Sequence, residues 1–156
     1  MRRIVSLTVA VVSTFVLGVV AAVATPARNA TRDDIARAVM TTGGGVDLRS
    51  GKETTVHRVT ITPGGSSGWH THHDGGVFMV VSGTMTTYGL DAPACEPTTV
   101  PAGEAYFVPP HAKHPHLVLN NSSEPLELLS LYFNVPKGQP SRIDAEAPAE
   151  CPTELR

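Results

Sequence analysis

Hydrophobic and polar residues alternate in short blocks after the three glycines that begin at Gly43. Runs rich in valine, threonine and aromatic residues are separated by breaks of glycine, proline, asparagine and aspartate. The runs expected to form strands are residues 54–62, 76–83, 84–90, 104–109, 116–120 and 126–135. Short strands with turn signals between them are typical of a β-sandwich or barrel. The sequence therefore predicts an all-β fold.

The segments that flank these runs have a different character. Residues 29–45 are expected to form a short helix, with Thr31 as its N-cap and the glycines from Gly43 at its end. The end of the chain is polar and rich in proline, so we expect an extended tail there. The expected division is a signal peptide at 1–24, an N-terminal helix and linker at 25–53, a barrel at 54–136 and the tail at 137–156.

A signal peptide is expected from the uncharged run at residues 4–24. Two arginines precede the run, and the tripeptide that ends at Ala24 has the small-x-small pattern of a signal peptidase site. We expect export with cleavage near Ala24. The alternative is a retained membrane anchor, because about 20 apolar residues can span a bilayer. In both cases the folded part lies outside the cytoplasm.

The charge pattern narrows the classes of partner. The formal net charge is −2 at pH 7, and the sequence contains no run of lysines or arginines. Nucleic acid is therefore not an expected partner, and a membrane is one only if residues 4–24 are retained.

The two cysteines, Cys95 and Cys151, are expected to form a disulfide. An even number of cysteines outside the cytoplasm favours a bridge, and this one would pin the tail to a loop of the domain. Two free thiols are the alternative. Neither cysteine is part of a Cys-x-x-Cys pair, so we expect no redox motif or zinc ribbon.

Histidines are concentrated in two short segments of the chain. His70 and His72 are two residues apart, so on a strand their side chains face the same way. His114 and His116 repeat that spacing, with His73 and His111 nearby. Neutral imidazole is the commonest protein ligand of transition metals. Two such pairs inside a barrel predict a metal site, and the alternative is that they are solvated loop residues.

Two longer segments resemble the motifs of the cupin superfamily. "PGGSSGWHTHHDGGVFMVVSG", residues 63–83, is similar to the first motif, in which a glycine, five residues and then His-x-His precede a glutamate and a glycine. "AGEAYFVPPHAKHPHLVLNNSSEPLELL", residues 102–129, is similar to the second, in which Gly leads to Pro, His and then Asn. The resemblance covers about Thr54 to Val135. It implies a cupin-type double-stranded β-helix, a jelly-roll barrel.

The resemblance also implies a set of metal ligands. His70 and His72 occupy the two histidine positions of the first motif, whereas the position of the family's glutamate holds Gly76. The carboxylate is absent, and Asp74 or His73 is the candidate to replace it.

The ligand of the second motif depends on the direction of counting. From Gly103 and Pro109 the position falls on His114, and from Asn120 it falls on His116. We favour His116, with His114 as a neighbour, an alternate or a fourth ligand, and we expect the other histidine of this segment in the loop.

The chemistry implied is that of one divalent transition metal ion, Fe, Ni, Cu, Mn or Zn, held by three neutral nitrogens. Three-histidine cupin sites without the glutamate resemble those of thiol and diketone dioxygenases, so dioxygen chemistry on a small molecule is the leading enzymatic expectation. The alternatives are a non-catalytic small-molecule-binding cupin, as a sensor or sequestering protein, and a structural barrel with a degenerate site. A homodimer through sheet edges is compatible with such a barrel.

A partly apolar substrate pocket is expected beside the histidines. Phe78 and Val80 alternate inward on the strand that follows the first motif. His57 shares the inward side of its strand with Val59 and Ile61, so it is either an acid–base residue of the pocket or a hydrogen-bonded core histidine. Nothing in the sequence identifies a catalytic residue.

Overall fold

The computed structural model describes residues 29–89, 95–110, 115–149 and 151. The chain divides into two compact units, Met1–Asp33 and Asp34–Arg156. Ten strands and no helix occur among the described residues, and every strand belongs to the second unit. The expected signal peptide or anchor at residues 1–24 lies outside the described residues. No helix within the described part of the chain is long and apolar enough to cross a membrane.

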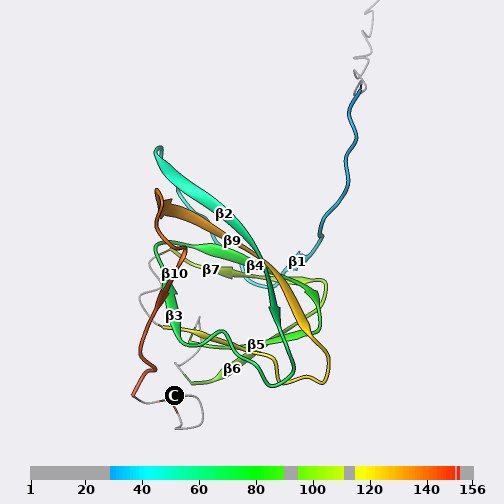
Figure 1. Ribbon diagram of the computed structural model, residues 1–156, viewed down its shortest axis with the longest axis vertical. Helices are drawn as coiled ribbons and strands as arrows, with labels where there is room; N and C mark the ends of the chain where they lie inside the picture. The colour runs from blue at the N-terminus through cyan, green and yellow to red at the C-terminus, as the bar shows by residue number, and fades with distance from the viewer. Residues whose placement is uncertain (1–28, 90–94, 111–114, 150, 152–156) are drawn as a thin grey trace, which may run out of the picture. The chain divides into compact units, whose positions relative to one another are not determined.

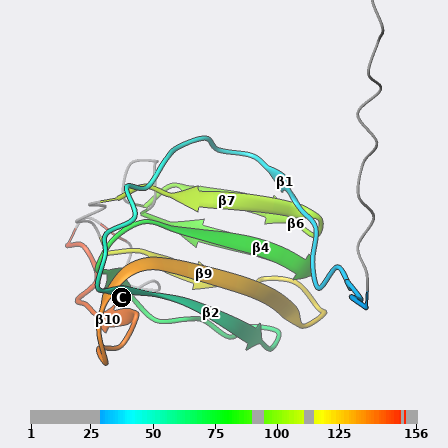
Figure 2. The same cartoon turned by 90° about the horizontal axis from the view of Figure 1, so that it is seen from above.

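One face of the barrel is a five-stranded sheet in the order β1-β7-β4-β9-β2. Figure 2 shows its strands side by side. The strands are β1 (Val39–Met40), β7 (Glu104–Val108), β4 (Gly76–Ser82), β9 (Leu126–Pro136) and β2 (Lys52–Ile61). β1 pairs with β7 in parallel, and the other pairs are antiparallel. The two long strands β2 and β9 pair over most of their length.

The opposite face consists of two smaller sheets (Figure 1). One has the order β6-β5-β8, formed by Pro97–Pro101, Thr84–Tyr88 and Leu117–Leu119, and the other pairs β10 (Arg142–Asp144) with β3 (His70–His72). Isolated bridges join Ser66 to Leu119 and His70 to His116, so the segment that leads into β3 runs beside β8. This pairing decides where the histidines of the two motifs meet.

The core fills the space between the two faces. Side chains alternate between buried and less buried along β4 and β9, because successive residues of a strand point to opposite sides. The buried cluster includes Phe78, Val80, Met85, Leu126 and Leu128, all less than 4% exposed. Each such side chain contributes about 1.5–3 kcal/mol by leaving water. The all-β jelly-roll prediction is confirmed.

The predicted helix over residues 29–45 is wrong. That segment is extended, and its strand β1 adds to the edge of the large sheet. The amides of Val39 and Thr41 donate to the carbonyls of Gly103 and Ala105, both at 2.8 Å. Ile35 is 78% and Val39 73% exposed, so these apolar side chains gain little from packing against the domain, and packing of this kind is what stabilises most helices in proteins. Pairing with the free edge of β7 satisfies the backbone instead.

The disulfide between Cys95 and Cys151 is confirmed, and it joins residues 56 positions apart. Cys151 is buried against Trp69 and Leu117 in a second, small apolar cluster. The bridge indicates a non-reducing environment. The tail was expected to be an extended segment outside the core. In the structure it contributes a strand to the barrel, because residues 142–144 form β10 and pair with β3.

Candidate metal centre

His70, His72 and His116 come together because of two strand pairings. His70 and His72 lie on β3 with one residue between them, which places their side chains on one face. His70 and His116 are directly opposite each other and exchange both backbone hydrogen bonds, at 3.0 and 2.9 Å. Directly opposite residues of an antiparallel pair project to the same face. All three imidazoles therefore point into the barrel.

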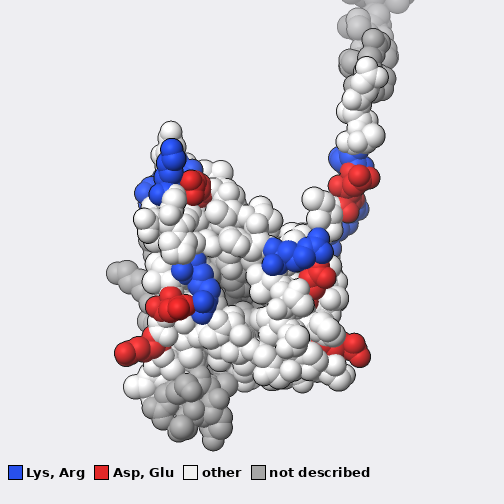
Figure 3. All heavy atoms as spheres, in the orientation of Figure 1, with Lys and Arg blue, Asp and Glu red and all other residues white. Residues whose placement is uncertain are grey.

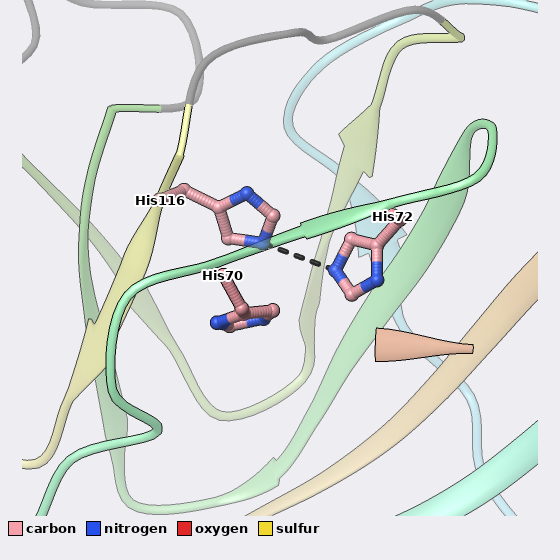
Figure 4. A group of neighbouring side chains, drawn as sticks. All are labelled: His70, His72 and His116. Carbon is pink, nitrogen blue, oxygen red and sulfur yellow. Dashed lines mark hydrogen bonds between the residues drawn. The ribbon is translucent and has the colours of Figure 1, made fainter. Parts of the chain in front are cut away.

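The three side chains form one compact group (Figure 4). Their ring centroids are 4.3–4.9 Å apart, and one nitrogen of each lies within 4.8 Å of the other two. The Nε2 atoms of His72 and His116 are 3.1 Å apart, as the dashed line shows. Among the described residues this is the one group of histidine, cysteine or carboxylate side chains that could hold a metal ion.

Backbone carbonyls fix the tautomers of two of these histidines. Nδ1 of His70 lies 2.8 Å from the carbonyl of Gly68, and Nδ1 of His72 lies 2.9 Å from that of Ser141. A carbonyl only accepts, so each Nδ1 carries the proton and each Nε2 presents a lone pair to the group. This arrangement is the one that orients imidazole ligands in metal sites.

His116 completes the set with an unusual proton arrangement. Its Nδ1 is buried and has no hydrogen-bond partner among the described residues. Without a cation, its Nε2 must donate to the lone pair of His72 across 3.1 Å. A cation at the junction would displace that proton, His116 would then carry its proton on Nδ1, and the three facing nitrogens would all donate electron pairs to the cation. The residues present therefore fit a metal ion.

Burial keeps the three imidazoles neutral. Loss of solvent lowers the pKa of His72 from 6.5 to about 4 and that of His116 to about 2, and it also lowers the pKa of His70. Neighbouring imidazoles and Arg142 are smaller causes of the same lowering of the pKa values of His72 and His116, and the hydrogen bond from His72 to Ser141 opposes it. At neutral pH the nitrogens are therefore unprotonated where a metal needs them.

The residues proposed as substitutes for the missing glutamate do not join the group. The Asp74 carboxylate is buried and accepts hydrogen bonds from Arg49, from Asn134 Nδ2 at 2.8 Å and from the Gly75 amide at 2.9 Å. Nε2 of His73 lies 3.1 Å from the carbonyl of Pro140. The Asp74 carboxylate therefore links Arg49 with Asn134, and the His73 side chain contacts the C-terminal tail at Pro140. His114 and His111 lie outside the described residues, so a fourth ligand from that loop stays a prediction.

A small cavity of about 70 Å³ lies beside His70, between the two faces of the barrel. Phe78 lines this cavity, whereas Val80 is buried in the core and does not; their role in a substrate pocket stays a prediction. His57 is directly opposite Ser130 and so faces the inward side of the large sheet, but it is exposed and does not line the cavity. Its Nε2 is 3.1 Å from Ser141 Oγ, and its ring centroid is 5.5 Å from that of Tyr132.

Several residues of the site were not predicted from the sequence, among them four polar ones. Ser130, Tyr132 and Arg142 line the cavity, and Ser141 holds His72. Ser130 and Tyr132 follow Leu126 and Leu128 on the inward face of β9, so polar side chains at inward positions were the available signal. The tail carried no such signal, because the pairing of β10 with β3 is set by residues far away in the sequence.

One family model matches this chain. The model described as "Cupin domain" matches residues 57–132. A comparison with curated proteins found no significant match. Similar solved structures include TT1209 from Thermus thermophilus, with 23% identity, a TM-score of 0.46 and coverage of 57% of this chain and 79% of that one. A cupin-like protein from Thermotoga maritima has 20% identity, a TM-score of 0.49 and coverage of 65% and 69%.

A structure described under the mechanism of oxalate oxidase is also similar, with 22% identity and a TM-score of 0.49. The match covers 59% of this chain and 46% of that one, so this chain spans less than half of that protein. The family match rests on the segment that carries both histidine motifs, and the observed barrel is the one those motifs imply. Residues 57–132 of this chain therefore form a domain of the cupin superfamily.

Proposed function

We propose that this protein binds one divalent transition metal ion through Nε2 of His70, His72 and His116 and acts as a dioxygenase on a small molecule. The observation that carries the proposal is the fixed tautomer of two imidazoles, whose Nδ1–H groups are held by the carbonyls of Gly68 and Ser141. Histidines that served only to pack a core would not need their lone pairs aimed at one another. When bound, such an ion supplies Lewis acidity and open coordination positions.

The neutral ligand set supports a particular kind of ligand. No carboxylate belongs to the group among the described residues, so the protein does not reduce the charge of the ion. A full positive charge in a buried site favours an anionic or chelating small molecule. Apolar side chains from both faces of the barrel line the adjoining cavity and limit access of water.

Tyr132 is the residue of this chain best placed to handle a proton. It lines the cavity, is 8% exposed, and its ring centroid is 4.4 Å from that of His72. Burial raises the pKa of its phenol, so the hydroxyl stays protonated at neutral pH and can donate a hydrogen bond to a bound molecule. We propose this donor role for Tyr132, rather than the acid–base role that was one of two alternatives for His57.

The second candidate function is a non-catalytic, metal-dependent binding protein that senses or sequesters a small molecule. The lining of the cavity favours it, because the described lining residues include no carboxylate and no pair of nucleophile and base. The two candidates share the metal site and differ only in turnover.

The place of action proposed for both is outside the cytoplasm. The intramolecular disulfide supports this localisation, and residues 1–24 are proposed as the cleaved signal or, alternatively, as an anchor. Pairing of two barrels into a homodimer is proposed on the likeness to other cupins alone.

Oxygen uptake separates the two candidates. Full-length protein, purified without a histidine tag and loaded in turn with Fe, Ni, Cu, Mn or Zn, is mixed with small carboxylates, thiols and diketones in an oxygen electrode. A dioxygenase consumes oxygen with one metal and one class of compound, and His72→Ala abolishes the consumption. Saturable binding of a compound without oxygen uptake contradicts the dioxygenase and supports the binding protein.

A further inference from the structure

Arg142 is placed at the cavity by the C-terminal strand. It lies on β10 directly opposite His72 of β3, and it lines the same cavity as His70. Its Nη2 donates to the carbonyl of Ser67 at 2.7 Å, and Nη1 lies 2.6 Å from Oδ1 of Asp144. The guanidinium is thus held at the edge of the cavity by a backbone contact and not only by rotamer preference.

The ion pair with Asp144 does not neutralise this arginine effectively. The Asp144 side chain is 83% exposed and that of Arg142 is 41% exposed. An ion pair in contact with solvent contributes little, so the carboxylate of a ligand can compete with it. A guanidinium has five N–H donors, and the two contacts given above engage only part of that fork.

No acidic side chain within the cavity offsets the positive charge of Arg142, because the described residues that line the cavity include no aspartate or glutamate. Arg142 contributes to lowering the pKa values of His70, His72, His116 and Tyr132, whereas among these groups Asp144 opposes it at His70 alone. Figure 3 shows a hollow in the face that is drawn, with basic side chains on either side of it and acidic side chains next to them. A divalent cation at the histidines would add to the same field and attract an anion.

The size and the walls of the cavity restrict what the anion can be. A volume of about 70 Å³ has room for on the order of five water-sized groups. The lining is largely apolar, with Val59, Ile61, Phe78, Val118 and Leu128, and the hydroxyl side chains of Ser67, Ser130 and Tyr132 also line it. An inorganic oxyanion would place oxygens against these walls without partners, which is costly. An anion with a short hydrocarbon end would not.

We propose that Arg142 is the specificity-determining residue of the site and that the ligand is a short aliphatic monocarboxylate. Its carboxylate pairs with the guanidinium beside the metal-side histidines, and its alkyl group lies against Ile61, Val118 and Leu128. The proposal rests on the proposed function for the cation beside His70, but the contact with Arg142 is a separate interaction. It therefore makes a prediction of its own.

The test compares butyrate with butyramide, which has the same shape and no charge. Binding to the full-length protein is measured by titration calorimetry with and without metal, after the metal content of each sample is determined. We expect wild-type protein to prefer butyrate, and Arg142→Met to lower butyrate affinity roughly 10- to 100-fold while butyramide is unaffected. Arg58→Met is the matched control, because Arg58 is exposed on β2 and pairs with Glu127 outside the cavity.

A second variant keeps the test valid if loss of the Ser67 contact harms folding. Arg142→Gln retains an N–H donor for that carbonyl and loses the charge, and the thermal melting of both variants is recorded. Equal butyrate affinity in wild type and in a folded, charge-free variant overturns the role of Arg142. Failure of wild type to bind any straight-chain monocarboxylate from acetate to valerate overturns the ligand class.

The outcome for the metal is separate. If no sample holds metal but butyrate still binds in a manner that depends on Arg142, the metal function fails and the anion site stands. If metal is bound and the variants bind butyrate as wild type does, the anion site fails and the metal function stands.

Discussion

Gly76 and Tyr132 face each other across the β4–β9 pair, and the absence of a side chain at one makes room for the ring of the other. A Cβ atom on residue 76 would lie 2.6 Å from the carbonyl oxygen of Leu131 and 3.4 Å from Cδ1 of Tyr132. The position of the family's glutamate is therefore closed to any side chain in this barrel. The aromatic ring of Tyr132, on β9, packs instead against His72 of β3, which belongs to another sheet.

This relationship predicts that a glutamate cannot simply be restored. Gly76→Glu forces the backbone of β9 to move, and we expect the free energy of unfolding to fall by about 1–3 kcal/mol, as for other overpacked positions. The metal content should not rise above that of wild type. Urea denaturation and mass spectrometry of the purified variant measure both. An unchanged free energy of unfolding would mean that β4 and β9 leave room for a side chain at residue 76.

Tyr132 is predicted to act through both its ring and its hydroxyl. Its ring contacts those of His72, Phe78 and His57, with centroids 4.4, 5.9 and 5.5 Å away. Tyr132→Ala should cost about 3–5 kcal/mol of stability, as for other buried aromatic residues, whereas Tyr132→Phe should cost about 1 kcal/mol or less. If the hydroxyl donates to the ligand, Tyr132→Phe weakens ligand binding and leaves metal content unchanged. If Tyr132→Phe binds the ligand as tightly as wild type does, the hydroxyl of Tyr132 does not contribute to ligand binding.

The disulfide is predicted to support the metal site through the tail. Cys151 anchors the segment in which Ser141 accepts the Nδ1–H of His72, and the Ala145 amide donates to the Trp69 carbonyl at 3.0 Å. Replacing both Cys95 and Cys151 with serine should lower the free energy of unfolding by on the order of 2–5 kcal/mol. Loss of the outer contact to His72 should weaken metal binding by roughly 10-fold or more.

Competition with a chromogenic chelator measures the metal affinity of the serine variant. Metal affinity equal to that of wild type, in a variant that is still folded, would show that the carbonyl of Ser141 holds His72 without help from the bridge.

The stability of the metal-free protein is predicted to fall as the pH is lowered. The pKa of His72 is about 4 in the folded chain and 6.5 when unfolded, so below pH 6.5 the unfolded chain binds more protons. By pH 4 this difference should cost about 3 kcal/mol for His72 alone, with His116 and His70 adding in the same direction. Urea denaturation from pH 7 to pH 4 measures the slope. A flat profile would mean that the imidazoles are not buried in solution.

The histidine pairs show how far the sequence could predict the site. The spacing of His70 and His72 sets their common face, and counting back from Asn120 selects His116. Asn120 is a dependable marker because its buried side chain donates to the carbonyls of Ile61 and Glu124, both at 2.8 Å, which fixes the loop after β8. Local patterns of this kind are legible in the sequence.

The contributions of Ser141 and Arg142 could not be predicted in the same way. They reach the site because β10 pairs with β3 about seventy positions earlier in the chain, and no alternation in the short polar tail indicates that pairing. The helix expected at residues 29–45 failed for a related reason. Its capping residues are local signals, and the free edge of β7 offers hydrogen bonds that outweigh them.

The metal content of the full-length protein tests the central claim most directly. Protein without a histidine tag is analysed by mass spectrometry beside His70→Ala/His72→Ala, His116→Ala and the control His73→Ala, whose side chain contacts Pro140 rather than the group. The account predicts about one transition metal ion per chain in wild type and in the control, and almost none in the other variants. Absence of metal from wild type after reconstitution with Fe, Ni, Cu, Mn or Zn, or equal metal in all four proteins, would contradict it.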